Sequence, residues 1–333
     1  MMKENPLQPD PVLRAIGALL GTPVTHADCQ AAPLHGGTLG DVQLLRGEAV
    51  AEDGRRLPFR LVQKTQKRWE RPGDPASWRR EYDLFPSALT AAFTPSFRAP
   101  RVLHAEIGET ENRLWMEYVE GRSGARLTPD DLSRAALELG RFQGRCAKQE
   151  EALRGIACLS DSGYPRREYA QWTPDTVEYR WLRSADCTLP HSLQTLLIDT
   201  QARADAIYKK LDSLPQVLCH RDYWTENIFA TDGGIVVIDW DCAGWGCAGE
   251  DIASLIADET EASQIPVYYR MLLPAYYQGL QEYVSLPPVG ELPIREMILL
   301  KFGYRLAQQV LFARRQEDKA EATAALREID ALR

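Results

Sequence analysis

The 333-residue chain has no CxxC pair, no long uninterrupted apolar run and no excess of basic residues. Its seven cysteines are scattered and odd in number, which predicts reduced thiols and argues against disulfides or structural zinc. We expect a cytoplasmic protein, because neither a membrane-spanning run nor a charged and then apolar leader is found. The net charge of −8 argues against nucleic acid or an anionic membrane as a partner.

Internal repeats and low-complexity tracts are also absent. The length is sufficient for a large core divided between two lobes or domains, as in a soluble enzyme. An acidic chain permits a cationic substrate without requiring one. The sequence leaves the oligomeric state open.

A dense polar motif is present from His220 to Asn227. Its fixed residues His220, Arg221, Asp222 and Asn227 match the kinase catalytic-loop pattern H-R-D-L-x-x-x-N in type and spacing. Phosphoryl transfer requires a positioned acceptor and neutralised phosphate charge more than covalent work by the protein. We therefore assign Asp222 as the catalytic residue that accepts or orients the acceptor hydroxyl.

The metal ligands of this predicted site are Asn227 and Asp239. Magnesium prefers hard oxygen donors and retains several waters, so an amide, a carboxylate and the phosphates of ATP complete its shell without His or Cys. Residues 227–230 and 235–238, with a turn between them, predict a hairpin that carries the two ligands at its ends. The alternative is a buried hairpin with ordinary turn aspartates.

The N-terminal part predicts a helix that starts at Asp10-Pro11 and stops at Gly21. Strands are expected over residues 33–50 and 57–65, joined by a turn at residues 52–54. The glycines of the first strand would let backbone N–H groups approach the phosphates of ATP, or would simply mark a hairpin turn. These glycines are Gly36, Gly37 and Gly40.

Lys64 lies in the second of these apolar strands and could reach the α and β phosphates of ATP, or could be an edge-strand lysine. A helix that starts near Asp74-Pro75 carries Glu81, which would orient Lys64 as in kinases. A solvated helix glutamate is the alternative for Glu81.

Residues 114–121 predict a strand that leaves the first lobe and forms a hinge. The backbone groups of Glu117 and Val119 would pair with the adenine edge, while Met116 would supply apolar surface. The alternative is an amphipathic strand that ends at glycine. From Thr128 onward the periodicity is mainly helical.

With these motifs the chain resembles the aminoglycoside phosphotransferase and choline kinase family of small-molecule kinases. The resemblance depends on the catalytic-loop motif, on Asp239 and its neighbours, and on Lys64 with Glu81. It implies an α+β, two-lobed protein-kinase-like fold with a mostly β N-terminal lobe and a helical C-terminal lobe. Residues 1–117 would form the nucleotide-binding lobe, and residues 118–333 the catalytic and substrate-binding lobe.

The resemblance also implies an ATP-dependent phosphotransferase that uses Mg²⁺ and a hydroxyl group of a small molecule as acceptor. His220 would buttress the catalytic loop, and Asp251 would brace it from the next helix. Two residues depart from the pattern: Arg221 stands where many members have glycine, and Gln143 where histidine often follows the helix motif. Neither change removes a metal ligand.

Other functions remain open. A protein kinase is disfavoured because only about twelve positions separate Asp239 from Asp251 and no Ala-Pro-Glu follows. A catalytically silent nucleotide-binding regulator and an interaction protein are further alternatives. Acidic side chains could bind an amine and aromatic ones could form walls, although charge runs are more often solvated surface and aromatic residues at such spacing more often belong to the core. These are Asp241, Asp258, Glu259 and Glu261, and Trp224, Trp245, Tyr268 and Tyr269.

Overall fold

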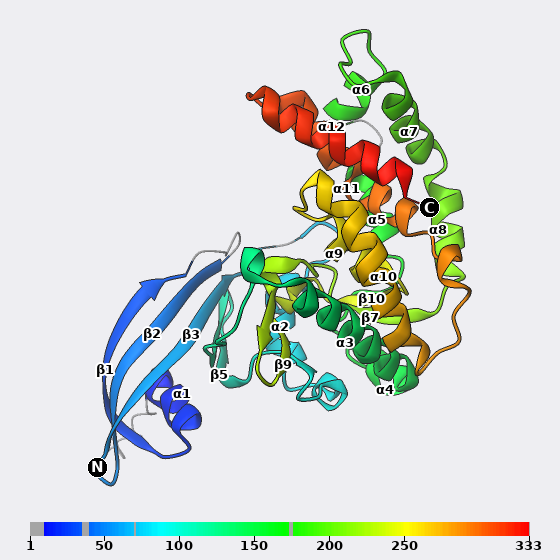
Figure 1. Cartoon of the computed structure of the whole chain (residues 1–333). Helices are drawn as coiled ribbons and strands as arrows, with labels where there is room; N and C mark the ends of the chain where they lie inside the picture. The colour runs from blue at the N-terminus through cyan, green and yellow to red at the C-terminus, as the bar shows by residue number, and fades with distance from the viewer. Residues whose placement is uncertain (1–9, 35–39, 70, 173–175, 333) are drawn as a thin grey trace. The chain divides into compact units, whose positions relative to one another are not determined.

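The computed structural model describes residues 10–34, 40–69, 71–172 and 176–332. It has a mostly β N-terminal region and a helical C-terminal region, which confirms the predicted α+β class (Figure 1). The chain forms two compact units. The first contains Met1–Arg71, Pro75–Ser87 and Ala99–Glu120, and the second contains Pro72–Asp74, Ala88–Arg98 and Gly121–Arg333.

The first unit is built on a five-stranded antiparallel sheet in the order β1-β2-β3-β6-β5. Helix α1 (Pro11–Leu20) lies against this sheet (Figure 1). Between them, apolar side chains such as Ile16, Leu61 and Trp115 form a buried cluster. The strands are β1 (Val24–Pro33), β2 (Gly40–Ala51), β3 (Arg56–Lys67), β5 (Val102–Ile107) and β6 (Glu111–Glu117).

Helix α1 begins and ends where the sequence predicts. The Asp10 carboxylate accepts the backbone N–H of Val12 at 2.8 Å, which satisfies one of the free donors of the first turn. Gly21 ends the helix in the left-handed conformation, with φ of 67°.

The single strand predicted over residues 33–50 is wrong. The structure has two strands, because β1 ends at Pro33 and β2 begins at Gly40. Most side chains of β1 are exposed, so this strand lacks the apolar alternation by which a half-buried strand is recognised. The turn before β3 agrees with the prediction, since Gly54 has φ of 83°.

The helix expected from Asp74-Pro75 is shorter than predicted. A 3-10 turn, η1 (Ser77–Arg79), precedes α2 (Arg80–Leu84). Glu81 lies in this one-turn helix and is only 1% exposed.

Helices α3 (Pro129–Lys148) and α10 (Ile265–Gln281) pack closely in the second unit. Gly140 and Gly279 lie at their contact, where a Cβ atom would come within 2.2 Å and 2.1 Å of backbone oxygens. The other helices of the unit are α4 (Glu150–Arg154), α5 (Tyr164–Trp172), α6 (Val177–Leu182), α7 (His191–Ala202), α8 (Ala204–Asp212), α9 (Glu250–Ala257), α11 (Ile294–Phe312) and α12 (Gln316–Ala331).

Short strands of the second unit carry the polar motif. Strand β7 (Gln216–Cys219) pairs with β10 (Gly244–Cys247), and β9 (Gly234–Val237) lies between β4 (Phe97–Arg98) and β8 (Ile228–Thr231). Stacked and edge-on aromatic rings fill the space between these strands and α3. They include Phe93, Phe97, Phe142 and Trp240. Within the described residues, no helix is both long and apolar enough to cross a bilayer.

Candidate active site

The predicted hairpin is present and is formed by β8 and β9. Ile228 pairs with Val237, and Thr231 pairs with Gly234, so Asp232 and Gly233 make the turn. Beyond the last pair, the backbone N–H of Ile238 donates to the carbonyl of Asn227 at 3.0 Å. The hairpin therefore places Asn227 opposite the residue that precedes Asp239.

Asp222 and Asn227 are joined by hydrogen bonds. The Nδ2 of Asn227 donates to Oδ2 of Asp222 at 2.8 Å and to its carbonyl oxygen at 2.9 Å. Because the two ends of an amide point in opposite directions, Oδ1 of Asn227 is turned away from Asp222. Asp222 itself is partly exposed, while Asn227 is buried. This arrangement leaves a carboxylate for an acceptor and an amide oxygen for a cation.

Asp239 follows β9 and has a left-handed backbone, with φ of 64° and ψ of 63°. This conformation costs a side-chain-bearing residue roughly 1–2 kcal/mol, although aspartate tolerates it better than most. Backbone strain of this kind is retained mainly where the surrounding structure uses it, as at active sites.

His220 connects the two segments that carry Asp222 and Asp239. Its Nε2 lies 2.9 Å from the carbonyl oxygen of Ile238, and its Nδ1 accepts the backbone N–H of Asp222 at 3.3 Å. A carbonyl can only accept, so His220 is the neutral tautomer with its proton on Nε2. Burial lowers the pKa of His220, against the opposing effect of the Asp222 and Asp239 carboxylates. The predicted role of His220 in supporting the loop is confirmed by these contacts.

Asp251 holds the start of the catalytic loop, as the sequence predicted. Its carboxylate accepts the backbone N–H groups of His220 at 2.7 Å and Arg221 at 2.8 Å, and Nε2 of Gln143 at 2.9 Å. Gln143 in turn accepts the hydroxyl of Tyr276 at 2.6 Å. Burial raises the pKa of Asp251 to about 6, with Glu250 contributing, although the backbone hydrogen bonds oppose the shift. Gln143 thus fills the position where family members often have histidine and supplies a neutral donor.

Arg221 is the second departure from the family pattern, and its backbone explains why glycine is common there. Its φ is 68°, in the left-handed region that glycine enters at little cost. The buried guanidinium donates to Oγ of Ser160 and to the carbonyl oxygens of Asp161 and Trp245. It also lies 3.3 Å from the Glu250 carboxylate.

Lys301 is a further contact of the loop that the sequence analysis missed. Its Nζ donates to the carbonyl of Arg221 at 2.6 Å and to Oγ of Ser254 at 2.7 Å. The signal in the sequence is a lysine and an arginine four residues apart, Lys301 and Arg305, in the stretch from Met297 to Phe312 that holds no other charged residue.

In the first unit the predicted pair of Lys64 and Glu81 is formed. Lys64 Nζ lies 2.5 Å from Oε2 of Glu81, and only 11% and 1% of the two side chains are exposed. Strand β3 lies between β2 and β6, so Lys64 is in the middle of the sheet and the edge-strand alternative is wrong. The solvated alternative for Glu81 is also wrong, because its side chain is buried.

Comparison with known proteins decides the family. Residues 51–283, more than half of the chain, match the model of the phosphotransferase enzyme family. The chain belongs to this family. The resemblance inferred from the motifs is confirmed, and no curated protein matches the chain by sequence.

Solved structures of kinases share the fold of this phosphotransferase. A microcompartment-associated aminopropanol kinase is 18% identical, with a TM-score of 0.56 over 96% of this chain and 95% of that one. An amicoumacin kinase is 14% identical, with a TM-score of 0.55 over 96% and 92%. Choline kinase from Cryptosporidium parvum Iowa II is 14% identical, with a TM-score of 0.54 over 90% and 88%. At these identities the likeness shows the fold alone.

The predicted hinge residues of the phosphotransferase lie at the end of β6. Met116 is buried, and Glu117 and Val119 are partly exposed. The backbone N–H of Glu117 donates to the carbonyl of Arg101 at 3.0 Å, and the Glu117 carboxylate accepts the backbone N–H of Arg101 at 2.9 Å. Gly40 begins β2, whereas Gly36 and Gly37 lie outside the described residues.

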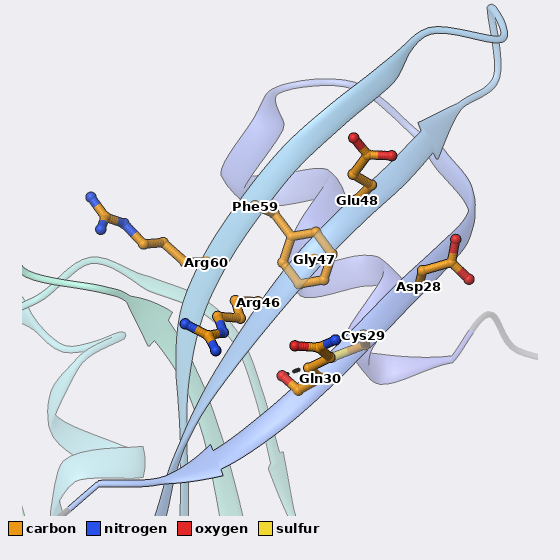
Figure 2. A pocket seen from close by; sticks show the side chains of 8 residues that line it. All are labelled: Asp28, Cys29, Gln30, Arg46, Gly47, Glu48, Phe59 and Arg60. Carbon is orange, nitrogen blue, oxygen red and sulfur yellow. Dashed lines mark hydrogen bonds between the residues drawn. The ribbon is translucent and has the colours of Figure 1, made fainter.

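A shallow pocket of about 590 Å³ lies on the sheet of the first unit (Figure 2). Arg46 and Arg60, which are paired across β2 and β3, line this pocket. Arg60 lies four positions before Lys64 on β3. Its other lining residues are Asp28, Cys29, Gln30, Gly47, Glu48 and Phe59. None of the predicted site residues contributes to this pocket, so we do not assign it to the reaction.

The donors at the hairpin suit a magnesium ion. Asp239 offers a carboxylate and Asn227 an amide oxygen, both hard ligands. Clusters of three or more His, Cys, Asp or Glu with the geometry of a metal site are absent from the part of the chain that the structure describes. A closed protein cage is not needed, because magnesium is usually held by one or two carboxylates together with phosphates and waters.

Proposed function

We propose that this phosphotransferase moves the γ-phosphate of Mg-ATP to a hydroxyl of a small molecule, such as an aminoglycoside-like compound, an amino alcohol or a sugar metabolite. The observation that carries the proposal is the joining of Asp222 to Asn227 at 2.8 Å, on a hairpin whose other end leads directly into Asp239. One short segment thereby presents a proton acceptor and two oxygen donors.

In the proposed reaction, the acceptor oxygen forms a bond to the γ-phosphorus while the bond to the β–γ bridging oxygen breaks and ADP leaves. The proton of the acceptor hydroxyl passes to Asp222. Oδ2 of Asp222 is held by Asn227, which leaves Oδ1 as the oxygen assigned to the hydroxyl. His220 and Asp251 fix the backbone on which Asp222 is carried.

Asn227 and Asp239 are the proposed magnesium ligands. When bound, the ion supplies positive charge that stabilises the phosphates during transfer. Asn227 contributes through Oδ1, since Nδ2 is used by Asp222. Asp239 contributes a carboxylate whose backbone is held in an uncommon conformation.

Lys64 is the proposed ligand of the nucleotide phosphates, oriented by Glu81. Backbone groups of Glu117 and Val119 would bind the adenine, Met116 would cover it, and Gly36, Gly37 and Gly40 would approach the phosphates. In this scheme residues 1–117 serve the nucleotide and residues 118–333 serve catalysis and the acceptor. Two similar structures, an amicoumacin kinase and an aminoglycoside phosphotransferase, contain the ATP analogue AMP-PNP, which supports ATP as the donor. A cytoplasmic location fits the use of ATP.

The choice of a small acceptor is supported by the segment between Asp239 and α9. It contains only the turn η5 (Trp240–Cys242) and strand β10, which is paired with β7. A long activation loop of the protein-kinase type has no place there. The kinases with similar folds are named for aminopropanol, amicoumacin and choline, all small molecules.

The proposal is tested by ADP release from Mg-ATP across a panel of aminoglycosides, amino alcohols, choline-like alcohols, sugars and hydroxy acids. The key variant is Asp222→Asn, whose Oδ1 can still accept from Asn227 while the proton acceptor is lost. The control is Asp232→Asn, which removes an exposed carboxylate from the turn of the same hairpin.

We expect Asp222→Asn to reduce turnover at least about 100-fold, the loss typical of removing a positioned general base. Thermal stabilisation by Mg-ATP should persist in this variant, because the altered group faces the acceptor. Asp232→Asn should behave as the wild type. Equal turnover by Asp222→Asn and the wild type would contradict the assignment.

A further inference from the structure

Two polar contacts join α9 to α11 beside the catalytic loop. The first is the hydrogen bond of Lys301 to Ser254, with Lys301 also bound to the carbonyl of Arg221. The second lies four residues further along both helices, where Nη1 of Arg305 is 3.9 Å from Oδ1 of Asp258. Residues four apart share a helix face, so Arg305 lies one turn from the residue that contacts the loop.

Backbone strain marks the same region. Among the described residues other than glycine, positive φ occurs at Arg221, Asp239 and Glu259, with values of 68°, 64° and 51°. The first precedes Asp222 and the second is a proposed metal ligand. The third directly follows Asp258. A left-handed residue after the C-cap commonly ends a helix, so the conformation of Glu259 terminates α9 and leaves Asp258 at the end of the helix.

Arg305 has hydrogen-bonding capacity that its neighbours in the described chain do not use. Its Nε donates to the hydroxyl of Tyr304 at 3.3 Å, and the 3.9 Å separation from Asp258 is too long for a hydrogen bond. About half of the side chain, 51%, is exposed. A guanidinium offers five N–H donors in a planar fork that matches a carboxylate, and it does not lose its charge.

Arg305 interacts electrostatically with Asp222, the proposed catalytic residue. Burial lowers the pKa of Arg305, but the Tyr304 hydroxyl and the carboxylates of Asp258 and Asp222 raise it above its ordinary value. The pKa of Asp258 is raised, chiefly by burial. The cations Lys301 and Arg305 oppose this shift, and the Asp222 carboxylate adds to it.

The same contacts weaken the idea of an acidic pocket for an amine. Asp258 already faces two cations, Glu259 and Glu261 are exposed, and Asp241 is buried. Trp245 is also buried and stacks with Arg154, so it does not form a wall.

We propose that Arg305, oriented by Asp258, binds a carboxylate of the acceptor while the acceptor's hydroxyl is presented to Asp222. This inference rests on the proposed function and names its substrate class: small hydroxylated carboxylic acids. Asp258 positions the guanidinium and does not take part in phosphate transfer.

The test uses acceptors in matched pairs, in which a carboxylate is compared with its neutral primary amide: L-serine, L-homoserine and glycerate with their amides. ADP release from Mg-ATP gives kcat and KM, and calorimetry with Mg-AMP-PNP present gives the affinity without turnover. The variants are Arg305→Gln and Arg305→Lys. The control is Arg327→Gln, which removes an exposed arginine of α12.

We expect at least one carboxylate to bind and react, with a KM at least about tenfold below that of its amide. Hydrogen bonds between a guanidinium and a carboxylate are strengthened by charge, and the neutral amide loses that strengthening. Arg305→Gln should raise that KM to the amide level and leave kcat and Mg-ATP stabilisation unchanged. Arg305→Lys should be intermediate, because the charge remains but the fork is lost. Arg327→Gln should match the wild type.

Several results would overturn the inference. Equal use of amides and carboxylates, turnover of neutral alcohols alone, or unchanged carboxylate affinity in Arg305→Gln would each do so, with the kinase function intact. Failure of every carboxylate to bind would also count against it. Loss of the proposed function itself would be recognised separately, as the absence of both Mg-ATP binding and Asp222-dependent ADP release.

Discussion

Arg221 combines a costly backbone conformation with a dense set of side-chain contacts. A left-handed arginine loses roughly 1–2 kcal/mol relative to glycine, and here the guanidinium contacts with Ser160, Asp161, Trp245 and Glu250 offset that cost. These contacts connect the residue before Asp222 to segments distant in the sequence. We infer that Arg221 positions the catalytic loop.

Replacement of Arg221 by glycine separates the two effects. The backbone strain is removed, but buried carbonyls lose their donor, so we expect the free energy of unfolding to fall by about 1–3 kcal/mol. The kcat should fall at least about tenfold, with the KM for ATP unchanged. Arg221→Lys should recover part of the kcat. A glycine variant with wild-type kcat would show that the contacts have no positioning role.

Lys64 and Glu81 form a buried pair, so removal of one partner takes from the other buried charge the opposite charge that it contacts. We predict that Lys64→Met destabilises the protein by roughly 3–5 kcal/mol, whereas the double variant Lys64→Met with Glu81→Met is much closer to the wild type. Both variants should lose stabilisation by Mg-ATP. Thermal unfolding with and without Mg-ATP measures both quantities, and strictly additive effects on stability would contradict the coupling.

At this scale the sequence predicts residue types well and their long-range partners poorly. Spacing alone singled out Asp222, Asn227 and Asp239 as candidates, because they lie in one short segment that contains the β8–β9 hairpin. The contacts of Arg221 with Ser160 and Lys301 join residues 61 and 80 positions apart, and no local pattern specifies such pairs.

Helices α3 and α10 illustrate how an element supports the site. Gln143 on α3 and Tyr276 on α10 are hydrogen-bonded to each other, and Gln143 then contacts Asp251. The close approach of the helices depends on glycine, since a Cβ on Gly140 would lie 2.2 Å from the carbonyl oxygen of Tyr276. The helix contact thereby sets the position of the brace under the catalytic loop.

We expect Gly140→Ala to lower the free energy of unfolding by about 1–3 kcal/mol, the usual cost of overpacking, despite the better helix propensity of alanine. Gly290→Ala is the matched control, because nothing lies within 4 Å of the added Cβ. Chemical denaturation of both variants measures the difference. A stabilised Gly140→Ala variant would mean that the helices adjust without cost.

Elements with a strong local signal were predicted, and those with a weak one were not. Helix α1 has a cap, a proline and a terminating glycine, and the β8–β9 hairpin has two apolar strands around a turn. Strand β1 is mostly exposed, and β10, with the sequence Gly-Trp-Gly-Cys, is fully buried but rich in glycine. Neither carries the pattern by which strands are recognised.

For the whole molecule, the raised pKa of Asp251 predicts a measurable pH dependence. The ordinary value is 3.8 and the folded value is about 6, so the folded protein holds this proton more tightly. The contribution of Asp251 to the free energy of unfolding is complete below pH 3.8 and is lost as the pH rises through about 6. Asp251→Asn does not titrate. The stability of the wild type relative to this variant should therefore decrease between these pH values and level off above them.

Activity should depend on pH in the opposite sense. The Asp251 carboxylate accepts N–H groups of His220, Arg221 and Gln143, and a proton on either of its oxygens would displace one of these donors. We expect kcat to fall as the pH decreases below about 6. Gln143→His offers Asp251 a partner that can carry positive charge, which would lower the pKa of Asp251 and move the acid limb to lower pH. An acid limb unchanged by Gln143→His would assign it to another group.

The account as a whole depends on the hairpin that carries Asn227 and Asp239 as a magnesium site. Calorimetric titration of ATP with and without Mg²⁺, in the wild type and in Asp239→Ala, tests it most directly. We predict that Mg²⁺ tightens ATP binding at least about tenfold in the wild type and has little effect in the variant. The same magnesium dependence in both proteins would contradict the account.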